Sequence, residues 1–189
     1  SRLATVVFQQ QLGSLLDKAE RMTTLAANLA KKIGANGEVT SRAAALAKCD
    51  LVSEMVLEFP ELQGIAGANY ALNDGEPAPV AQAIEEHYLP RFAGDGLPTS
   101  AEASALALAD RLDTLVGIFG IGEPPTGSKD PFALRRASLA VIRILIGLEQ
   151  SVSLHDLLDF ARDQHTASLA QDSAHSVLNY IFERLDNWY

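Results

Sequence analysis

The sequence predicts an all-α fold, a helical bundle followed by a C-terminal helical extension. Apolar residues recur every three or four positions through most of the 189 residues, which is the spacing of amphipathic helices. No segment shows the sustained alternation of apolar and polar residues that is typical of a strand. A Pro/Gly-rich loop, IGEPPTGSKD, indicates one internal boundary. We therefore expect the bundle to cover residues 1–128 and the extension to cover residues 129–189.

The first half of the chain is predicted to form four helices. Residues 4–33 keep an apolar stripe at helical spacing, and Gly34 is expected to end that helix. A second helix is expected from about residue 40 to Phe59, because Pro60 cannot continue it. The stretch ELQGIAGANYALND predicts a third helix, and PVAQAIEEH a short fourth one.

We expect the other segments to pack around the stretch Pro98–Gly120. It opens with Thr99 and, three residues later, Glu102, a spacing that is typical of a capping box. Leucines and a phenylalanine then recur at helical spacing and must face a core. Asp110 and Asp113 lie three residues apart on a neighbouring face. The same helix is therefore expected to fill the core and to present two carboxylates.

The last third of the chain is predicted to hold three more helices. Asp130 is expected to cap a helix over residues 131–148, with proline at its favoured first position. Ser153 is expected to cap a helix that extends to residue 162. The final helix is expected to begin at residue 172 or 173 and to end near Trp188.

Charge and composition exclude several classes of protein. The net charge is −9, from 15 Lys and Arg against 24 Asp and Glu, which argues against a chain that holds nucleic acid mainly through phosphate contacts. A local basic patch is compatible with this balance. Apolar runs are too short to span a membrane, and the single cysteine fits a reducing cytoplasm. Since the chain begins at Ser1 without a signal sequence, we interpret it as part of a larger cytoplasmic protein.

Two separate segments are similar to a known hydrolase superfamily. AAALAKCD and, far downstream, ALALADRLDTL resemble the metal-dependent phosphohydrolases named after their His-Asp (HD) doublet. The segment between them, EEHYLPRFAGDGLP, resembles part of the cyclic-dinucleotide phosphodiesterase branch. That superfamily is all-α, so the resemblance implies an HD-domain-like helical bundle.

A second resemblance covers essentially the whole chain. Several long strings are similar to the central part of the bacterial glycyl-tRNA synthetase β-subunit family, namely LGSLLDKAERM, LAKCDLVSEMVLEFPELQG, GEPAPVAQAIEEHYLPRFAGDGLP, ALADRLDTLVGIFGIG and PTGSKDPFALRRASLAVIRI. The resemblance implies an HD-type domain with further helices that lead toward an anticodon-binding domain, itself absent from this chain. It implies tRNA(Gly), the α-subunit and the remaining β-subunit domains as partners, and no membrane. It also implies that ATP and Mg²⁺ serve the α-subunit of the complete enzyme, with no cofactor in this segment.

Against the phosphohydrolase pattern, most of the metal-binding histidines are missing. The doublet reads Cys49-Asp50, with cysteine where the superfamily has histidine, and Arg21 lies near the place of an upstream histidine. His87 and Asp110 occupy matching positions. Since a catalytic metal needs a fuller set of ligands, we expect a vestigial site that holds no metal and catalyses nothing.

Each of these positions also has a purely structural interpretation. Asp50 and Asp110 would pair with Lys48, Arg111 or Arg21, or accept hydrogen bonds from helix ends. Cys49 would be a small buried residue, and His87 would interact with the dipole of a helix end. The other histidines, at positions 155, 165 and 175, have no clustered partners and are expected at the surface.

The stretch PPTGSKDPFALRR is the stronger candidate for contact with RNA. Lys129, Arg135 and Arg136 collect positive charge within two turns, and the backbone amides of Gly127-Ser128-Lys129, just ahead of a predicted helix start, are expected to offer donors to a phosphate. The alternative is that Asp130 caps the helix and that the arginines pair with acids of the 98–120 helix. Arg91, next to an aromatic residue, is a further candidate that would stack on RNA or anchor its own loop.

Three hypotheses of function follow. The first is a non-catalytic module of glycine–tRNA ligase that supports tRNA binding while ATP-dependent glycylation occurs on the α-subunit. The second is a metal-dependent HD-type phosphohydrolase with residual activity. The third is a structural spacer, for which no surface substitution would affect RNA.

Overall fold

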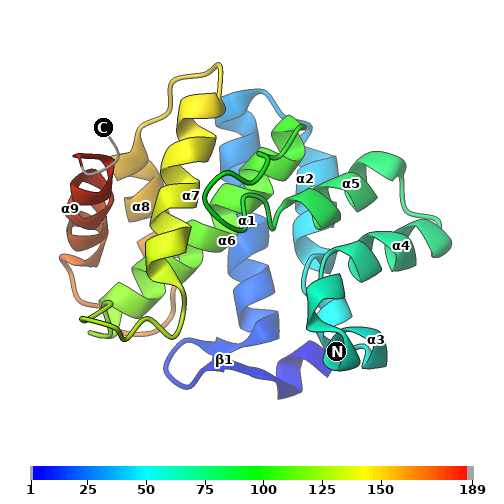
Figure 1. Cartoon of the computed structure of the whole chain (residues 1–189), viewed down its shortest axis with the longest axis horizontal. Coiled ribbons are helices and arrows are strands. Elements are labelled where there is room, and N and C mark those ends of the chain that lie inside the picture. Colours follow the sequence, from blue (N-terminus) through cyan, green and yellow to red (C-terminus); the bar gives the residue numbers. More distant parts are fainter. Residues whose placement is uncertain (1, 187–189) are drawn as a thin grey trace.

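The computed structural model describes residues 2–186, which form a mostly helical bundle with one small hairpin (Figure 1). Its α-helices are α1 (Leu15–Ile33), α2 (Gly37–Leu46), α3 (Glu54–Glu58), α4 (Ile65–Asn73), α5 (Ala78–Glu86), α6 (Ala101–Gly120), α7 (Leu134–Gly147), α8 (Leu154–Asp163) and α9 (Ser173–Asp186). The shorter elements are β1 (Val7–Gln9), β2 (Gly13–Ser14) and the 3₁₀ helices η1 (Arg2–Thr5), η2 (Cys49–Val52) and η3 (Pro60–Leu62).

Helix α6 is the centre of the bundle, as the sequence predicts. It contacts α1, α2, α5, α7, α8 and α9. Its leucines at positions 106, 108, 112 and 115 are fully buried. In Figure 1, α8 and α9 lie on one side of the molecule and α4 and α5 on the other, so α6 joins the two sides. The helical class is therefore confirmed, whereas the HD-like identity of the bundle and the boundary at residues 128/129 remain predictions.

The start of α6 differs from the predicted capping box. Ser100, and not Thr99, is the N-cap, and its hydroxyl accepts a hydrogen bond from the amide of Ala103. Thr99 instead donates to the carboxylate of Glu86 on α5. The carboxylate of Glu102 accepts from the amide of Asn36, just before α2. Thr99 and Glu102, which the sequence predicts to bond to each other, thus form their hydrogen bonds with Glu86 of α5 and with Asn36 before α2.

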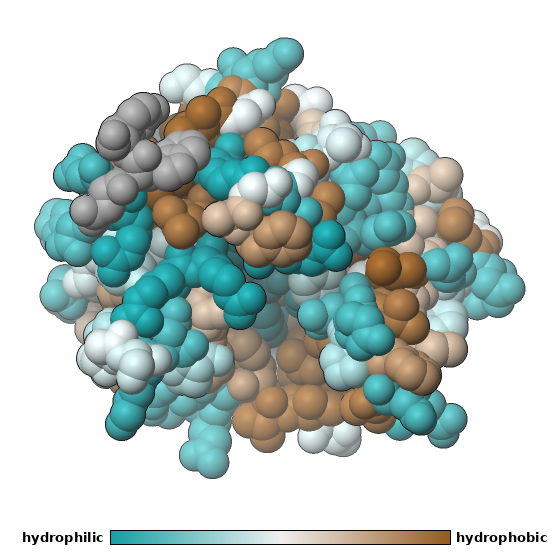
Figure 2. Space-filling view, in the orientation of Figure 1, coloured by the Kyte–Doolittle hydropathy of each residue, from teal (hydrophilic) through white to brown (hydrophobic). Residues whose placement is uncertain are grey.

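The predicted helix over residues 4–33 is wrong in its first eleven positions. Strands β1 and β2 form an antiparallel hairpin there, and α1 begins only at Leu15. Ser14 caps α1 through a complete capping box with Asp17, and Gly13 before it has a φ of +91°, which favours glycine. Exposed apolar side chains gather along the lower edge of Figure 2, over the hairpin and α3. The C-terminal end is as predicted, because Gly34 adopts the left-handed conformation.

The predicted helix over residues 40–59 is divided into three pieces. Helix α2 ends at Leu46, η2 follows, and Ser53 caps a separate α3. The division places the buried carboxylate of Asp50 against the backbone amides of Gly64 and Gly67, at 2.7 and 3.1 Å. Asp50 therefore serves the start of α4, and it does not share a helix with Glu54.

The last three helices follow the prediction more closely. The carboxylate of Asp130 accepts hydrogen bonds from the amides of Leu134 and Arg135 in the first turn of α7. The N-cap residue, however, is Ala133, so the helix begins three residues later than expected and Pro131 is not its first residue. Ser153 caps α8 as predicted. Helix α9 begins at Ser173, while the predicted end near Trp188 lies outside the described residues. Within residues 2–186, no helix is long and apolar enough to cross a membrane.

The last residue of α6 allows the α8–α9 loop to lie directly on this helix. A Cβ on Gly120 would lie 2.8 Å from the Cβ of Leu169, and the loop is tied to α6 because Ala170 donates to the Gly120 carbonyl. We expect Gly120→Ala to lower the free energy of unfolding by about 1–2 kcal/mol, since overpacking outweighs the gain in helix propensity. Urea denaturation measures this change.

The matched control for this substitution is Gly37→Ala, in the first turn of α2. A Cβ at Gly37 would meet no other atom within 4 Å. This substitution is expected to leave stability unchanged or to raise it by up to about 1 kcal/mol. Equal effects of the two substitutions would show that the contact with Leu169 is not restrictive.

Candidate functional site

A cleft of about 690 Å³ opens between the hairpin, α1, α6, the loop over residues 88–98 and the start of α7. It is lined by five basic side chains, which are Lys18, Lys48, Arg91, Arg111 and Arg136. Asp110 lies among them and comes from the middle of α6. The cleft is therefore a basic region in a chain whose net charge is −9.

Two lysines hold the carboxylate of Asp110 between them. The ammonium of Lys18 lies 3.1 Å from one carboxylate oxygen, and that of Lys48 lies 2.7 Å from the other. Burial alone would raise the pKa of Asp110, but Lys48 and Lys18 hold it well below its usual value. Burial likewise opposes the charged form of Lys48, and the carboxylate of Asp110 outweighs it, so that the pKa of Lys48 is raised. Asp110 and Lys48 are thus both charged and neutralise each other in part.

Asp113, one turn further along α6, is also paired with basic groups. Its carboxylate lies 3.0 Å from the ammonium of Lys18 and 2.6 Å from the guanidinium of Arg21. The imidazole of His165 lies 3.2 Å away, with its side chain only 1% exposed, so the prediction that His165 is a surface residue is wrong. The other two histidines of that prediction, at positions 155 and 175, are exposed as expected.

His87 is buried as a neutral imidazole at the end of α5. Its Nδ1 lies 2.5 Å from the carbonyl oxygen of Ile84, and its Nε2 lies 3.0 Å from the ammonium of Lys48. The carbonyl accepts from Nδ1–H and the ammonium donates to Nε2, which together define one neutral tautomer. Burial and the neighbouring Lys48 lower the pKa of His87 to about 3.

The residues of the predicted vestigial metal site are only partly brought together. His87 and Asp110 lie 3.8 Å apart across Lys48, whereas Asp50 faces the start of α4. Cys49 is exposed, so its predicted burial is wrong. The predicted pairing of Asp110 with Lys48 is confirmed. Asp50 accepts hydrogen bonds from two backbone amides at a helix start, which is one of the two structural roles predicted for it.

A divalent cation does not fit this donor set. The ammonium of Lys48 lies between His87 and Asp110, at hydrogen-bond distance from both, where a shared ion would need to be. Lys18 occupies the other oxygen of Asp110. A metal ion would have to displace two ammonium groups and then bear the repulsion of both. The chemistry of the metal-dependent hydrolases therefore has no support in these residues.

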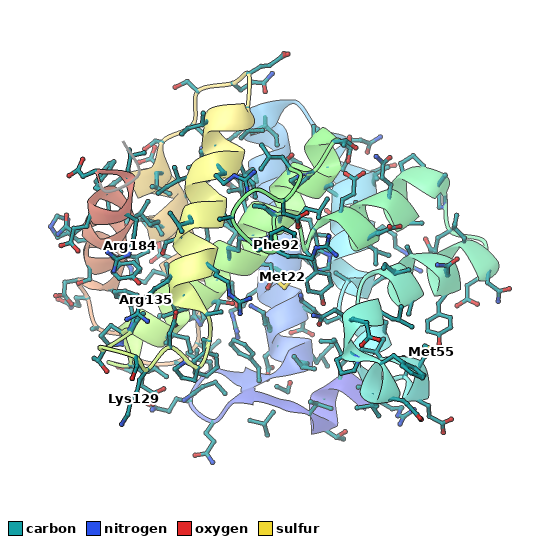
Figure 3. The ribbon with its side chains drawn as sticks, viewed as in Figure 1. Met22, Met55, Phe92, Lys129, Arg135 and Arg184 are labelled. Carbon is teal, nitrogen blue, oxygen red and sulfur yellow. The ribbon has the colours of Figure 1, made fainter. Side chains whose placement is uncertain are left out.

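The four predicted RNA-contact residues fall into two pairs. Arg91 and Arg136 line the mouth of the cleft, whereas Lys129 and Arg135 lie beside the 126–130 turn (Figure 3). Arg135 donates to the carbonyl of Gly127, and the two amides at the start of α7 donate to Asp130. The first amides of α7 are thus used by the chain's own carboxylate, and the amide of Lys129 donates to the carbonyl of Thr126. Phosphate binding by the amides of Gly127 and Ser128 stays a prediction.

Arg136 differs from the other arginines of the cleft. It is exposed and has no hydrogen-bond or ion-pair partner among residues 2–186. Arg91 is paired with Asp95 at 2.9 Å, and Arg111 donates to the carbonyls of Tyr88 and Pro90. Neither predicted pairing of Arg135 or Arg136 with an acid of the 98–120 helix occurs among the described residues. Among the arginines that line the cleft, and counting only contacts within residues 2–186, Arg136 is thus the one whose guanidinium is free to meet a ligand.

The charges of the cleft and its wall do not cancel. Five basic side chains line the cleft, and the carboxylates that lie against them are Asp110, Asp113 beside Lys18 and Asp95 beside Arg91, which leaves two positive charges in excess among the described residues. Sequence reasoning missed Lys18 as a part of the site, and it expected Arg111 to pair with a carboxylate, whereas Arg111 donates to backbone carbonyls. Lys18 lies one turn before Met22 on the apolar stripe of α1, and a lysine on such a stripe is the signal that could have revealed it.

Comparison with known proteins agrees with the resemblance found in the sequence. All of residues 1–189 match the family described as glycyl-tRNA synthetase beta subunit. The chain belongs to this family. Over 189 residues it is 55% identical to the glycine–tRNA ligase beta subunit of Chromohalobacter salexigens and 52% identical to that of Coxiella burnetii. Over 185 residues, 97% of the chain, it is 56% identical to that of Ectopseudomonas mendocina.

The chain corresponds to a segment of these relatives. It spans 28% of the length of the Chromohalobacter protein and 27% of the length of the other two. The predicted membership of the glycyl-tRNA synthetase β-subunit family is thus confirmed, while the position of the segment and its HD-type origin remain predictions.

Proposed function

We propose that this chain is a non-catalytic helical module of a glycine–tRNA ligase β-subunit and that its basic cleft supports the binding of tRNA(Gly). The observation that carries the proposal is Arg136, a guanidinium without a partner among the described residues at the mouth of a cleft with excess positive charge. ATP-dependent glycylation, with its Mg²⁺, would take place on the α-subunit. The other partners would be that subunit and the remaining β-subunit domains.

The cleft would act on the RNA through its phosphates. A phosphate at the mouth would meet Arg136 directly, while Lys18, Lys48 and Arg111 add a positive potential from behind. Because those three side chains are held by Asp110, Thr114 and backbone carbonyls, they keep their positions without the ligand. The acidic remainder of the chain would face solvent or partner domains and limit the contact to this region.

Arg136→Glu tests the proposed phosphate contact. In the complete ligase, with both subunits present, we expect this substitution to raise the Kd for tRNA(Gly) about tenfold. Arg136→Gln should reduce the slope of log Kd against log salt by about one, because one fewer counterion is released. Glycyl-adenylate formation should be unchanged, since it needs no tRNA contact. Filter binding at several salt concentrations and pyrophosphate exchange measure these quantities.

The matched control is Lys32→Glu, which makes the same change of charge. Lys32 is exposed in the last turn of α1, about 21 Å along the helix from Lys18. The Lys32→Glu substitution should change the Kd for tRNA(Gly) by less than about twofold. If Arg136→Glu has no larger effect than Lys32→Glu, the cleft does not contact tRNA, and a structural spacer describes the segment better.

A further inference from the structure

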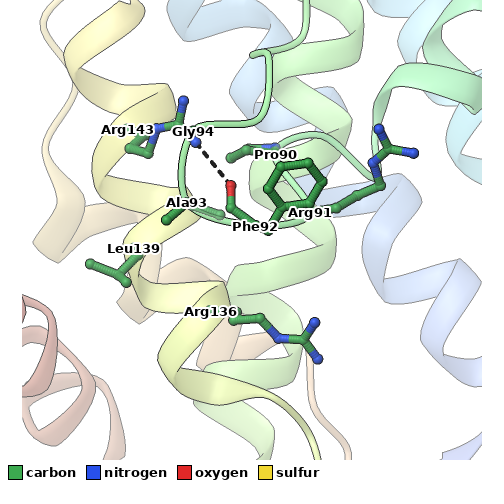
Figure 4. Close-up of a pocket in the computed structure, with 9 residues that line it drawn as sticks. Pro90, Arg91, Phe92, Ala93, Gly94, Arg136, Leu139 and Arg143 are labelled. Carbon is green, nitrogen blue, oxygen red and sulfur yellow. Dashed lines mark hydrogen bonds between the residues drawn. The ribbon is translucent and has the colours of Figure 1, made fainter.

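A second pocket lies next to the basic cleft, between the 88–98 loop and α7 (Figure 4). Its volume is about 330 Å³, at the lower end of the range for small-molecule pockets. The two hollows share one wall, which consists of Pro90, Arg91 and Arg136. A ligand held by Arg136 at the mouth of the cleft therefore reaches the second pocket without crossing any other part of the surface.

The lining of this pocket combines an apolar interior with cationic edges. Phe92 and Leu139 supply apolar surface, and Phe92 is 59% exposed. Arg91, Arg136 and Arg143 supply three guanidinium groups, and among the described residues no acidic side chain lines the pocket. A flat aromatic ring that is joined to a negatively charged group matches this lining, and a nucleotide combines such a ring, its base, with a phosphate.

The loop that forms one side of the pocket is held in place without a ligand. Arg143 on α7 donates to the carbonyls of Phe92 and Asp95, at 3.3 and 2.6 Å, and Figure 4 shows the first of these bonds. The carboxylate of Asp95 accepts from both the amide and the guanidinium of Arg91. The exposure of Phe92 is thus a feature of a tethered loop, and little conformational entropy would be lost on binding.

We propose that this pocket binds one unstacked nucleotide of the RNA, with the base against the ring of Phe92 and its phosphate at Arg136. The inference rests on the proposed function, because it adds a base to the phosphate contact at the shared wall. Apart from the arginines, the side chains that line the pocket, within the described part of the chain, have no hydrogen-bonding group. Binding by stacking tolerates any base, so the pocket recognises that a nucleotide is unpaired and not which base it carries.

Phe92→Ala in the complete ligase tests this inference with two RNA probes. The first probe is tRNA(Gly), which has unpaired nucleotides, and the second is a blunt RNA duplex without any. We expect Phe92→Ala to weaken tRNA binding about tenfold, which corresponds to about 1.4 kcal/mol, and to leave duplex binding unchanged. Phe92→Trp, which keeps an aromatic face, should retain tRNA affinity. Phe182→Ala, at an exposed phenylalanine on α9, is the matched control and should change neither affinity.

The outcomes separate this inference from the proposed function. If Arg136→Glu weakens the binding of both probes and Phe92→Ala weakens neither, the phosphate contact stands and the nucleotide pocket is wrong. If Phe92→Ala weakens both probes equally, the ring supports the loop and does not stack on a base, which also overturns the inference. If Arg136→Glu affects neither probe, the proposed function fails, and the pocket proposal fails with it.

Discussion

Asp110→Asn is expected to lower the free energy of unfolding by about 3–5 kcal/mol, because it leaves buried charge without its partner. The carboxylate of Asp110 neutralises Lys48 and shares Lys18 with Asp113, and both lysine side chains are 5% exposed. An amide in its place cannot compensate the ammonium of Lys48, whose other neighbours are the neutral groups of His87 and Tyr88. Urea denaturation of this chain at neutral pH measures the loss.

Two further variants show whether the uncompensated charge is the cause. Adding Lys48→Met to Asp110→Asn removes the orphaned ammonium and should recover a large part of the lost stability. Asp163→Asn removes an exposed carboxylate that is paired with Arg162, and it should change stability by less than about 0.5 kcal/mol. A loss below about 1 kcal/mol for Asp110→Asn would contradict the burial of a charged network.

The stability of the chain is expected to fall by about 2 kcal/mol between pH 7.5 and pH 5 through His87 alone. The pKa of this imidazole is about 3 in the folded chain, below its ordinary value of 6.5. Between these two values the unfolded chain binds a proton that the folded chain does not bind, so stability is full above pH 6.5 and is lost as the pH falls. The groups that face His87 are Lys48, Asp110 and Arg111, of which the two cations oppose its protonation.

Urea denaturation across this pH range measures the effect, with His87→Gln as the comparison. Glutamine keeps an uncharged acceptor near Lys48 and cannot titrate. Between pH 7.5 and pH 5 the free energy of unfolding of the His87→Gln variant should therefore fall by about 2 kcal/mol less than that of the parent chain. The lowered pKa values of Asp110 and Asp113 act in the same direction but only as the pH falls below about 4, outside this range. Parallel pH profiles for the two proteins would show that His87 titrates normally.

Sequence reasoning was most accurate for helices whose boundaries depend on nearby residues. Ser153 caps α8 through a hydrogen bond three residues away, and Gly34 ends α1 by its own conformation. It failed where residues that fit a local pattern make stronger contacts with distant parts of the chain. The hairpin before α1 was missed because Val7 and Leu12 also fit the apolar period of a helix, and only the pairing of β1 with β2 distinguishes the two.

In the candidate site, too, the features that depend on nearby residues could be predicted and those that depend on distant contacts could not. Arg91 and Arg136 are 45 positions apart in the sequence, and their common wall between two pockets exists only because the 88–98 loop is tied to α7. In the same way, the sequence indicates a carboxylate near the core at Asp110 and offers Lys48 among its expected partners, but it does not indicate that Lys18 of α1 would also converge on it.

The sequence by itself determined the helical class, the central place of α6 and the family of the chain, because these depend on local period and on long ordered strings of residues. Only the tertiary structure decided what Asp110 of α6 does. Long-range contacts placed two lysines on Asp110 and left Arg136 without a partner among the described residues, at the mouth of the cleft. Burial made the lysine–aspartate pairing strong, since charges that are removed from water must be neutralised by one another.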